Sequence, residues 1–379
     1  MPELLDIIGQ DSALAHLQRV LAGKRRPHAY ILAGPEGVGR RTTAVEFARL
    51  LLCERPRRQP NNGRLAELPK DFSLQLACGA CPSCRTVSAE TNPDLQLVYK
   101  ELARYHDDSK IRDRVMQGLG IEVIRKYLIA PAYLASSGGR GKVFIVRQAE
   151  LMSIPAQNAL LKTLEEPPAQ VTIILICHSP GELLPTTRSR CQVVRLGRLA
   201  ADFVAKALAD AGVDKTEAAF WAAFSDGSPG LAGRLAEQDL YEFKRDLLQR
   251  LAVVSAGGEG DLAETLTRAM DRHAARLRKR DEKLAATLVN RQAGQTILAM
   301  IASVYRDALS AACGAHRPPI HADQAQAVRK IAGRFDAPTL ANILAQLSRY
   351  EQLLWRNVNP KLLWDNVAVT CVTATALEV

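Results

Sequence analysis

The stretch "HAYILAGPEGVGRRTTAVEFARLLLC", residues 28–53, decides the fold of this chain. An apolar run over residues 29–33 leads into a glycine-rich turn, and a helical pattern follows. Gly34 and Gly39 have the spacing G-x-x-x-x-G, which is typical of a phosphate-binding loop at a helix N-terminus. The alternative, a loop that only connects a strand to a helix, is disfavoured because strand, glycines and helix coincide.

The side chains that normally complete such a loop are replaced. Arg40 stands where a lysine would reach the phosphates, and Arg41 stands where a Ser/Thr hydroxyl would bind Mg²⁺. Thr42 comes one position later, which turns it about 100° around the helix. Any nucleotide that still binds is expected at Gly34, Gly39, Arg40, Arg41 and Thr42, in a degenerate loop.

A second part of the ATP machinery is also missing. Acidic residues that hold Mg²⁺ and orient water are expected after the strand at residues 142–146, but Arg147 and Gln148 occupy these positions. Glu150 lies too far along the chain to replace both acids. The sequence therefore predicts that the chain does not hydrolyse ATP. Weak nucleotide binding without turnover stays open, because Arg40, Arg41 and Arg147 can attract an anion.

The first two hundred residues alternate strand and helix patterns, which predicts an α/β domain. The strand patterns are continuous apolar runs, which is typical of a parallel sheet buried on both faces. The predicted strands are residues 29–33, 95–99, 142–146, 171–177 and 192–196. The predicted helices between them are residues 10–22, 41–53, 121–132 and 154–165.

Beyond residue 200 the strand signal disappears, and apolar residues recur at the three- and four-residue spacing of helices. We expect three domains: a nucleotide-fold domain at 1–199, a small helical domain at 200–248 and a larger helical domain at 249–379. The basic stretch "RHAARLRKR" (272–280) favours a solvated helix face, with a contact to DNA phosphates or a partner as the alternative.

A cysteine cluster lies inside the first domain. Cys78, Cys81 and Cys84 form a C-x-x-C-x-x-C, and Cys53 is the natural fourth ligand of a tetrahedral metal. Structural zinc is favoured for this module (53–84), with an iron–sulfur cluster or unliganded thiols as alternatives. The remaining four cysteines, interpreted as small buried thiols, are Cys177, Cys191, Cys313 and Cys371.

Bulk composition narrows the class of protein. The chain has 379 residues, a net charge of +10 and a pI near 9.3, which favours an acidic partner such as nucleic acid. It has no apolar run long enough for a membrane helix and no secretion signal pattern at its start, so we expect a cytoplasmic protein.

Arg188 and Arg190 lie just before the strand at 192–196, in "TTRSRCQVVRL". An arginine at the edge of a nucleotide-fold domain can stabilise the γ-phosphate of a neighbouring subunit's ATP. By position alone, a solvated surface arginine is the favoured interpretation.

Taken together, "CGACPSC", "KVFIVRQAELMSIPAQNALLKTLEEPP" and "TTRSRCQVVRL" resemble the delta-prime subunits of bacterial DNA polymerase III clamp loaders, in the AAA+ family. The resemblance is dense over residues 5–200 and thinner through "GSPG" (227–230), "YRDAL" (305–309) and "NVNPKLLWDNV" (357–367).

The resemblance implies an AAA+ domain, a helical lid and a helical collar. It also implies a heteropentamer with gamma/tau and delta subunits, which loads the sliding clamp on primed DNA during replication in the bacterial cytoplasm, at the nucleoid. In such a subunit the loop is degenerate, and the arginine of "SRC", here Arg190, acts in trans on a neighbour's ATP. Cys53, Cys78, Cys81 and Cys84 would be zinc ligands.

The chain departs from this family at several positions. Asn92 stands where a histidine is common, Arg147 is unusual, and Gly230 replaces an arginine that senses nucleotide. The segment 54–77 is also longer than expected. The main alternative is an active gamma/tau-like clamp-loader ATPase with variant residues. Another alternative is a zinc-containing nucleic-acid-binding protein outside replication.

Overall fold

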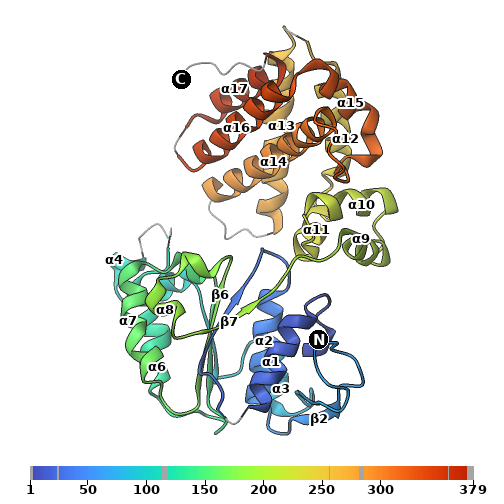
Figure 1. Cartoon of the computed structure of the whole chain (residues 1–379). Helices are drawn as coiled ribbons and strands as arrows, with labels where there is room; N and C mark the ends of the chain where they lie inside the picture. Colours follow the sequence, from blue (N-terminus) through green and yellow to red (C-terminus); the bar gives the residue numbers. More distant parts are fainter. Residues whose placement is uncertain are drawn as a thin grey trace. The chain divides into compact units, whose positions relative to one another are not determined.

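A computed structural model describes most of the chain (Figure 1). The described residues are 3–23, 25–112, 118–255, 257–280, 286–356 and 358–373. The chain forms two compact units, Met1–Leu199 and Ala200–Val379. The division of the second unit into 200–248 and 249–379 stays a prediction, and its residues 281–285 and 374–379 lie outside the described ranges. Within those ranges, no helix is both long and apolar enough to span a membrane.

The first unit is built on a parallel sheet of five strands, in the order β4-β5-β6-β1-β7. The strands are β1 (Ala29–Ala33), β4 (Leu95–Val98), β5 (Lys142–Val146), β6 (Val171–Cys177) and β7 (Gln192–Arg195). All five predicted strands form, with β4 and β7 ending one residue early. The predicted α/β fold class with a parallel sheet is confirmed. β1 lies between β6 and β7, so the glycine loop that follows it opens at the carboxyl edge of the sheet.

Helices cover both faces of this sheet, as continuous apolar strands require. Tyr30 and Leu32 of β1 point into a core with Leu14, Leu17 and the first two helices. Ile31 points to the opposite face, into the core formed with α7. Figure 1 shows the sheet running between these helices.

The helices of the first unit agree with the sequence patterns to within one residue at each end, where a pattern was found. The region 121–132 is helical throughout, but Arg125–Ile129 takes a π-helical turn. The helices are α1 (Asp11–Ala22), α2 (Arg40–Leu52), α3 (Pro82–Ser88), α4 (Ser109–Arg112), α5 (Ile121–Ile124), α6 (Ala130–Ala132), α7 (Ile154–Glu165) and α8 (Pro185–Arg188).

The segment 54–77 contains a β-hairpin and buried leucines, although its sequence is largely polar. β2 (Arg57–Pro60) and β3 (Ser73–Leu76) pair as an antiparallel hairpin. Leu65, Leu68 and Leu74 are buried within it, and Gln75 of β3 exchanges hydrogen bonds with Gln18 of α1. The scattered leucines therefore give this insertion its own contribution to the core.

The described part of the second unit is entirely helical, as predicted. Within this unit, Lys244 links two segments that are far apart in the sequence: its ammonium, 1% exposed, contacts both carboxylate oxygens of Asp323 at 2.7 and 2.6 Å. The helices are α9 (Ala201–Asp210), α10 (Lys215–Phe224), α11 (Pro229–Ala236), α12 (Tyr241–Val253), α13 (Glu259–Arg280), α14 (Ala286–Ala312), α15 (Ala325–Arg334), α16 (Ala337–Leu353) and α17 (Pro360–Thr373).

Candidate functional site

The glycine loop has the backbone of a phosphate-binding loop. Gly37 and Gly39 adopt positive φ angles of 77° and 99°, and Gly39 is the N-cap residue of α2. A Cβ at Gly34 would lie 2.3 Å from the Leu196 carbonyl oxygen, so only glycine fits there. The first amides of α2 therefore face the carboxyl edge of the sheet, where an anion can be bound.

Arg40, at the lysine position, is almost completely buried, with 9% of its surface exposed. Its Nη1 has no hydrogen-bond partner among the described residues. Burial lowers the pKa of Arg40, while the negative charges of Glu150 and Glu182 act in the opposite direction. The loop thus holds a buried cation that faces acidic groups of the protein itself.

The two residues that follow point elsewhere. The exposed guanidinium of Arg41 forms an ion pair with Glu90, away from the loop. Thr42 is exposed, whereas the hydroxyl of Thr43 donates to the Gly39 carbonyl oxygen at 2.9 Å. Arg41 has no hydroxyl for a loop-bound Mg²⁺, and Thr42 lies one residue beyond the position from which such a hydroxyl binds the metal.

The positions after β5 carry no acidic pair. The guanidinium of Arg147 lies 5.5 Å from the centre of the Tyr99 ring, and Gln148 adopts a left-handed conformation with φ 51°. Glu150 lies beyond them, where its carboxylate contacts His178 Nδ1 at 2.5 Å.

Sequence reasoning missed the neighbours of Glu150. His178 directly follows β6, and Glu182 comes from the short helix after it. One ligand atom from each of Glu150, His178 and Glu182 lies within 4.8 Å of the others. The position of His178 at the end of a central strand was the available signal, because such strand ends meet at one edge of a parallel sheet.

Arg190 lies between α8 and β7, with one third of its side chain exposed. Its Nη1 donates to the Thr186 carbonyl oxygen at 2.8 Å and to Ser189 Oγ at 3.3 Å. Its Nη2 forms an ion pair with Glu165, the last residue of α7, which is half exposed. One nitrogen is thus anchored, and the other is held by a carboxylate that solvent can reach.

Gly230 lies in the second unit, in the first turn of α11. Ser228 caps this helix by accepting the Leu231 amide at 3.2 Å, and Gly230 itself is exposed. This position therefore has no side chain with which to contact a nucleotide.

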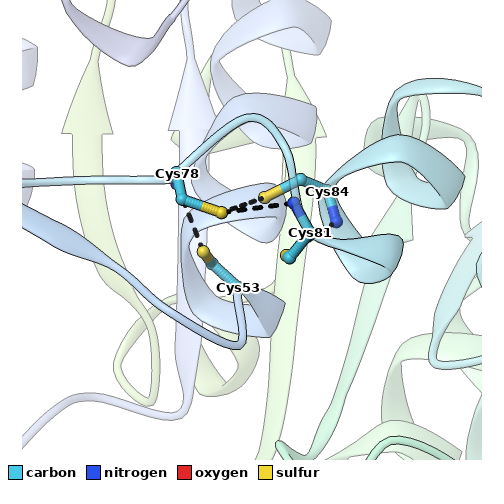
Figure 2. Close-up of side chains that lie close together, drawn as sticks. All are labelled: Cys53, Cys78, Cys81 and Cys84. Carbon is cyan, nitrogen blue, oxygen red and sulfur yellow. Dashed lines mark hydrogen bonds between the residues drawn. The ribbon is translucent and has the colours of Figure 1, made fainter.

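The four cysteines predicted as ligands gather at one point (Figure 2). Their sulfur atoms all lie within 4.8 Å of one another, and the Cys78 and Cys84 sulfurs are 3.9 Å apart. Cys53 ends α2, Cys78 follows β3, and Cys81 and Cys84 begin α3. Residues 25 positions apart in the chain are thus brought together by the folding of the hairpin.

Backbone amides favour the thiolate form of Cys78, whereas burial raises the pKa of Cys53 and of Cys84. The amide of Cys78 donates to the Cys53 sulfur at 3.3 Å, and the amide of Cys81 donates to the Cys78 sulfur at 3.4 Å. Burial acts against ionisation of Cys78, but the amides of Ala80 and Cys81 and the thiols of Cys53 and Cys81 together outweigh it and lower the pKa of Cys78 to about 6. Four thiolates around zinc at about 2.3 Å stand about 3.8 Å apart, so this donor set fits one such ion.

Two protein-family models match this chain, one in each of its two units. A family model described as DNA polymerase III, delta subunit, matches residues 9–200. A second model, for the C-terminal part of that subunit, matches residues 264–370.

The individual proteins that this chain resembles are also subunits of DNA polymerase III. The DNA polymerase III subunit delta' of Pseudomonas aeruginosa is 36% identical over 59% of this chain and 60% of that protein. The delta' subunit of Escherichia coli is 30% identical over 62% of each. The tau subunit of Bacillus subtilis is 30% identical over 49% of this chain and 28% of that protein. The chain thus matches about three fifths of the length of the two delta' relatives.

Among solved structures, a gamma-subunit-related protein from Thermotoga maritima aligns over 95% of this chain and 98% of that protein, with 17% identity and a TM-score of 0.45. The RuvB branch-migration motor of Thermotoga maritima aligns over 65% of each chain, with 17% identity and a TM-score of 0.37.

Proposed function

This chain belongs to the DNA polymerase III delta-subunit family, and from that premise we propose that it serves as the delta' subunit of a bacterial clamp loader. It would assemble with gamma/tau and delta subunits and help to load the sliding clamp on primed DNA, at the replisome in the cytoplasm. Two delta' relatives support this role, because they align with 59% and 62% of the chain. The gamma/tau alternative is weaker, because the tau match covers only 49% of the chain.

Within this assembly the chain would be a member that does not hydrolyse ATP. The ion pair of Arg41 with Glu90 and the cation–π contact of Arg147 with the Tyr99 ring support this proposal, since both side chains have partners in the protein itself. Phosphate release by the isolated chain should equal the background of a no-enzyme control. Steady release above that background, abolished by Arg40→Ala, would instead favour the gamma/tau-like ATPase.

Arg190 is the residue we propose to act on ATP held by a neighbouring subunit. This proposal rests on the different partners of its two terminal nitrogens. Nη1 is anchored by Thr186 and Ser189, whereas Nη2 pairs with the exposed Glu165 and with no other described residue. A γ-phosphate carries more negative charge than a carboxylate and accepts more hydrogen bonds, so it can replace Glu165 as the partner of Nη2.

The test is ATP hydrolysis by the reconstituted complex with clamp and primed DNA present. Arg190→Ala should lower the stimulated rate by at least about tenfold while the complex still assembles, since a trans arginine contributes about 10³–10⁵ to the rate at the site it serves. Arg188→Ala is the matched control, because Arg188 is exposed two residues away and should leave the rate unchanged. An unchanged rate in Arg190→Ala, with assembly intact, would exclude the trans role.

The cysteine cluster is proposed to hold one structural zinc ion. Four sulfurs within 4.8 Å of one another support a single ion, because a cluster of several iron atoms needs its ligands further apart. Metal analysis of the purified chain should give one zinc per chain and no iron–sulfur absorption. Zinc should be lost in Cys81→Ser, whereas Cys313→Ser should retain it. Cys313 is remote in sequence, and the interpretation of it as a buried thiol is wrong, because it is exposed.

A further inference from the structure

We propose that the cavity between α12 and α13 in the second unit binds a phosphate group, carried either by a free phosphorylated molecule or by the backbone of a nucleic acid. The cavity has a volume of about 470 Å³. It exists because α13 packs mainly on α14 and α17, whereas α12 packs on α15, which leaves the two helices apart.

The α13 wall of the cavity is a stripe of arginines. Arg268, Arg272 and Arg276 are four residues apart, which places them on one face of the helix, and all three line the cavity. Arg250 of α12 faces them from the other wall. The stripe contains part of the basic run 272–280, which the clamp-loader proposal does not use.

Most of these charges are already neutralised, and one is not. Arg250 forms an ion pair with Asp246 at 2.7 Å, Arg268 pairs with Glu264, and Arg276 lies 3.6 Å from Asp239. Arg276 also donates to the carbonyl oxygens of Gln238 and Asp239, at 2.6 and 3.0 Å. Glu242, the remaining acid of the lining, pairs with Arg245 at 3.2 Å. Among the described residues, Arg272 has no acidic partner, so the cavity retains one guanidinium that can bind an anion.

His273 is the second and independent observation. It lines the cavity and is 1% exposed, yet neither ring nitrogen has a hydrogen-bond partner among the described residues. A buried polar group without a partner destabilises a fold, so such a group beside a cavity indicates that something in the cavity pairs with it. Burial lowers the pKa of His273 to about 4, with a smaller contribution from Arg276. The neutral ring therefore offers one N–H donor.

These donors fit a phosphate better than a carboxylate. The guanidinium of Arg272 presents several N–H groups in a fixed fork, and His273 adds another from a different direction. A carboxylate has two oxygens in one plane, whereas the oxygens of a phosphate diverge and can accept from both. The net charge of +10 also favours a polyanionic partner.

The experiment measures binding of inorganic pyrophosphate and of single-stranded oligothymidylate to the full chain, by calorimetry and fluorescence anisotropy. Arg272→Ala should weaken binding about tenfold, the loss expected for one charge-assisted hydrogen bond. Arg349→Ala is the matched control, since Arg349 is an exposed arginine on α16 of the same unit. Loss with pyrophosphate alone assigns a free phosphorylated ligand, and loss with the oligonucleotide assigns a nucleic-acid backbone.

Equal weakening by Arg272→Ala and Arg349→Ala would show general charge attraction and overturn the proposal, as would no binding of either probe. His273→Leu separates binding from folding. It removes the buried polar ring while keeping an apolar side chain, so it should raise the Tm and weaken binding together. A raised Tm with unchanged binding would also overturn the site. Because the isolated chain is used, failure here leaves the clamp-loader proposal untouched.

Discussion

Single residues hold the hairpin insertion in place, and Asn61 is the central one. It is 1% exposed, and its Nδ2 donates to the carbonyl oxygens of Leu65, Leu68 and Pro69 at 2.9 to 3.1 Å. Its Oδ1 accepts the Leu65 amide at 2.8 Å. Asn61→Asp has the same shape but places a negative charge among three carbonyl oxygens. We expect it to lower the free energy of unfolding by about 3 kcal/mol, measured by denaturant titration.

The neighbouring Asn62 provides the control for this change, because it is exposed and its substitution by aspartate adds the same charge to the surface. Asn62→Asp should alter stability by less than about 0.5 kcal/mol. Equal stability of the two variants would mean that the bonds made by Asn61 do not stabilise the hairpin.

A buried histidine makes the second unit sensitive to acid. His321 is fully buried and contacts Ser303 Oγ through Nε2 at 2.9 Å. Burial first, and then the charge of Lys244, lowers its pKa to about 3, although Asp323 acts in the opposite direction.

Between pH 3 and the ordinary histidine pKa of about 6.5, the unfolded chain therefore binds a proton that the folded chain does not. Stability should fall as the pH falls through this range, by roughly 2 kcal/mol from this residue between pH 7 and pH 5. In His321→Gln, the difference in unfolding free energy between these two pH values should shrink by that amount. His316→Gln, at an exposed histidine, should leave the difference as it is in the original chain. An undiminished pH difference in His321→Gln would contradict this assignment.

At the scale of elements, the turn before β5 depends on a close approach of two backbones. Gly141 has φ 95°, and a Cβ there would lie 2.1 Å from the Gln170 carbonyl oxygen, which accepts the Lys142 amide at 3.0 Å. Gly141→Ala must therefore displace the start of β5 from β6. Its thermal unfolding midpoint should drop far more than that of Gly139→Ala. Gly139 also has a positive φ, but nothing lies within 4 Å of its added Cβ, so its cost is about 1–2 kcal/mol. Similar midpoints for the two variants would rule out the backbone contact as the cause.

The strands of the parallel sheet were predicted correctly from the pattern of apolar residues, whereas the β2–β3 hairpin was not. The strands β1, β5 and β6 are buried on both faces. A continuous apolar run predicts such a strand, because every side chain along it must lie in a core. The β2–β3 hairpin was not predicted, because its residues Arg57–Pro60 are polar and exposed. Only their pairing with β3 and the burial of Leu74 and Leu76 make them a strand.

At the scale of the whole molecule, each of the two units has its own buried core. Residues 1–199 enclose the two clusters on either face of the sheet, and residues 200–379 bury Trp221, Trp364 and Tyr305. Each unit expressed alone should therefore unfold cooperatively, with a midpoint within a few degrees of one transition of the full chain. Differential scanning calorimetry can check this. A fragment without a cooperative transition would show that its core needs the other unit.

The sequence by itself determined the fold class, the glycine spacing of the loop, the presence of Arg40 and Arg41 at its end and the spacing of Cys53, Cys78, Cys81 and Cys84. These features depend on residue type and local spacing, which a chain carries before it folds. Only the tertiary structure decided which side chains come together: Glu150 with His178 and Glu182, Arg190 with Glu165, and the arginines of α13 with Arg250 of α12 around one cavity. These contacts join residues from separate elements, and sheet order and helix packing, rather than spacing along the chain, set the distances between them.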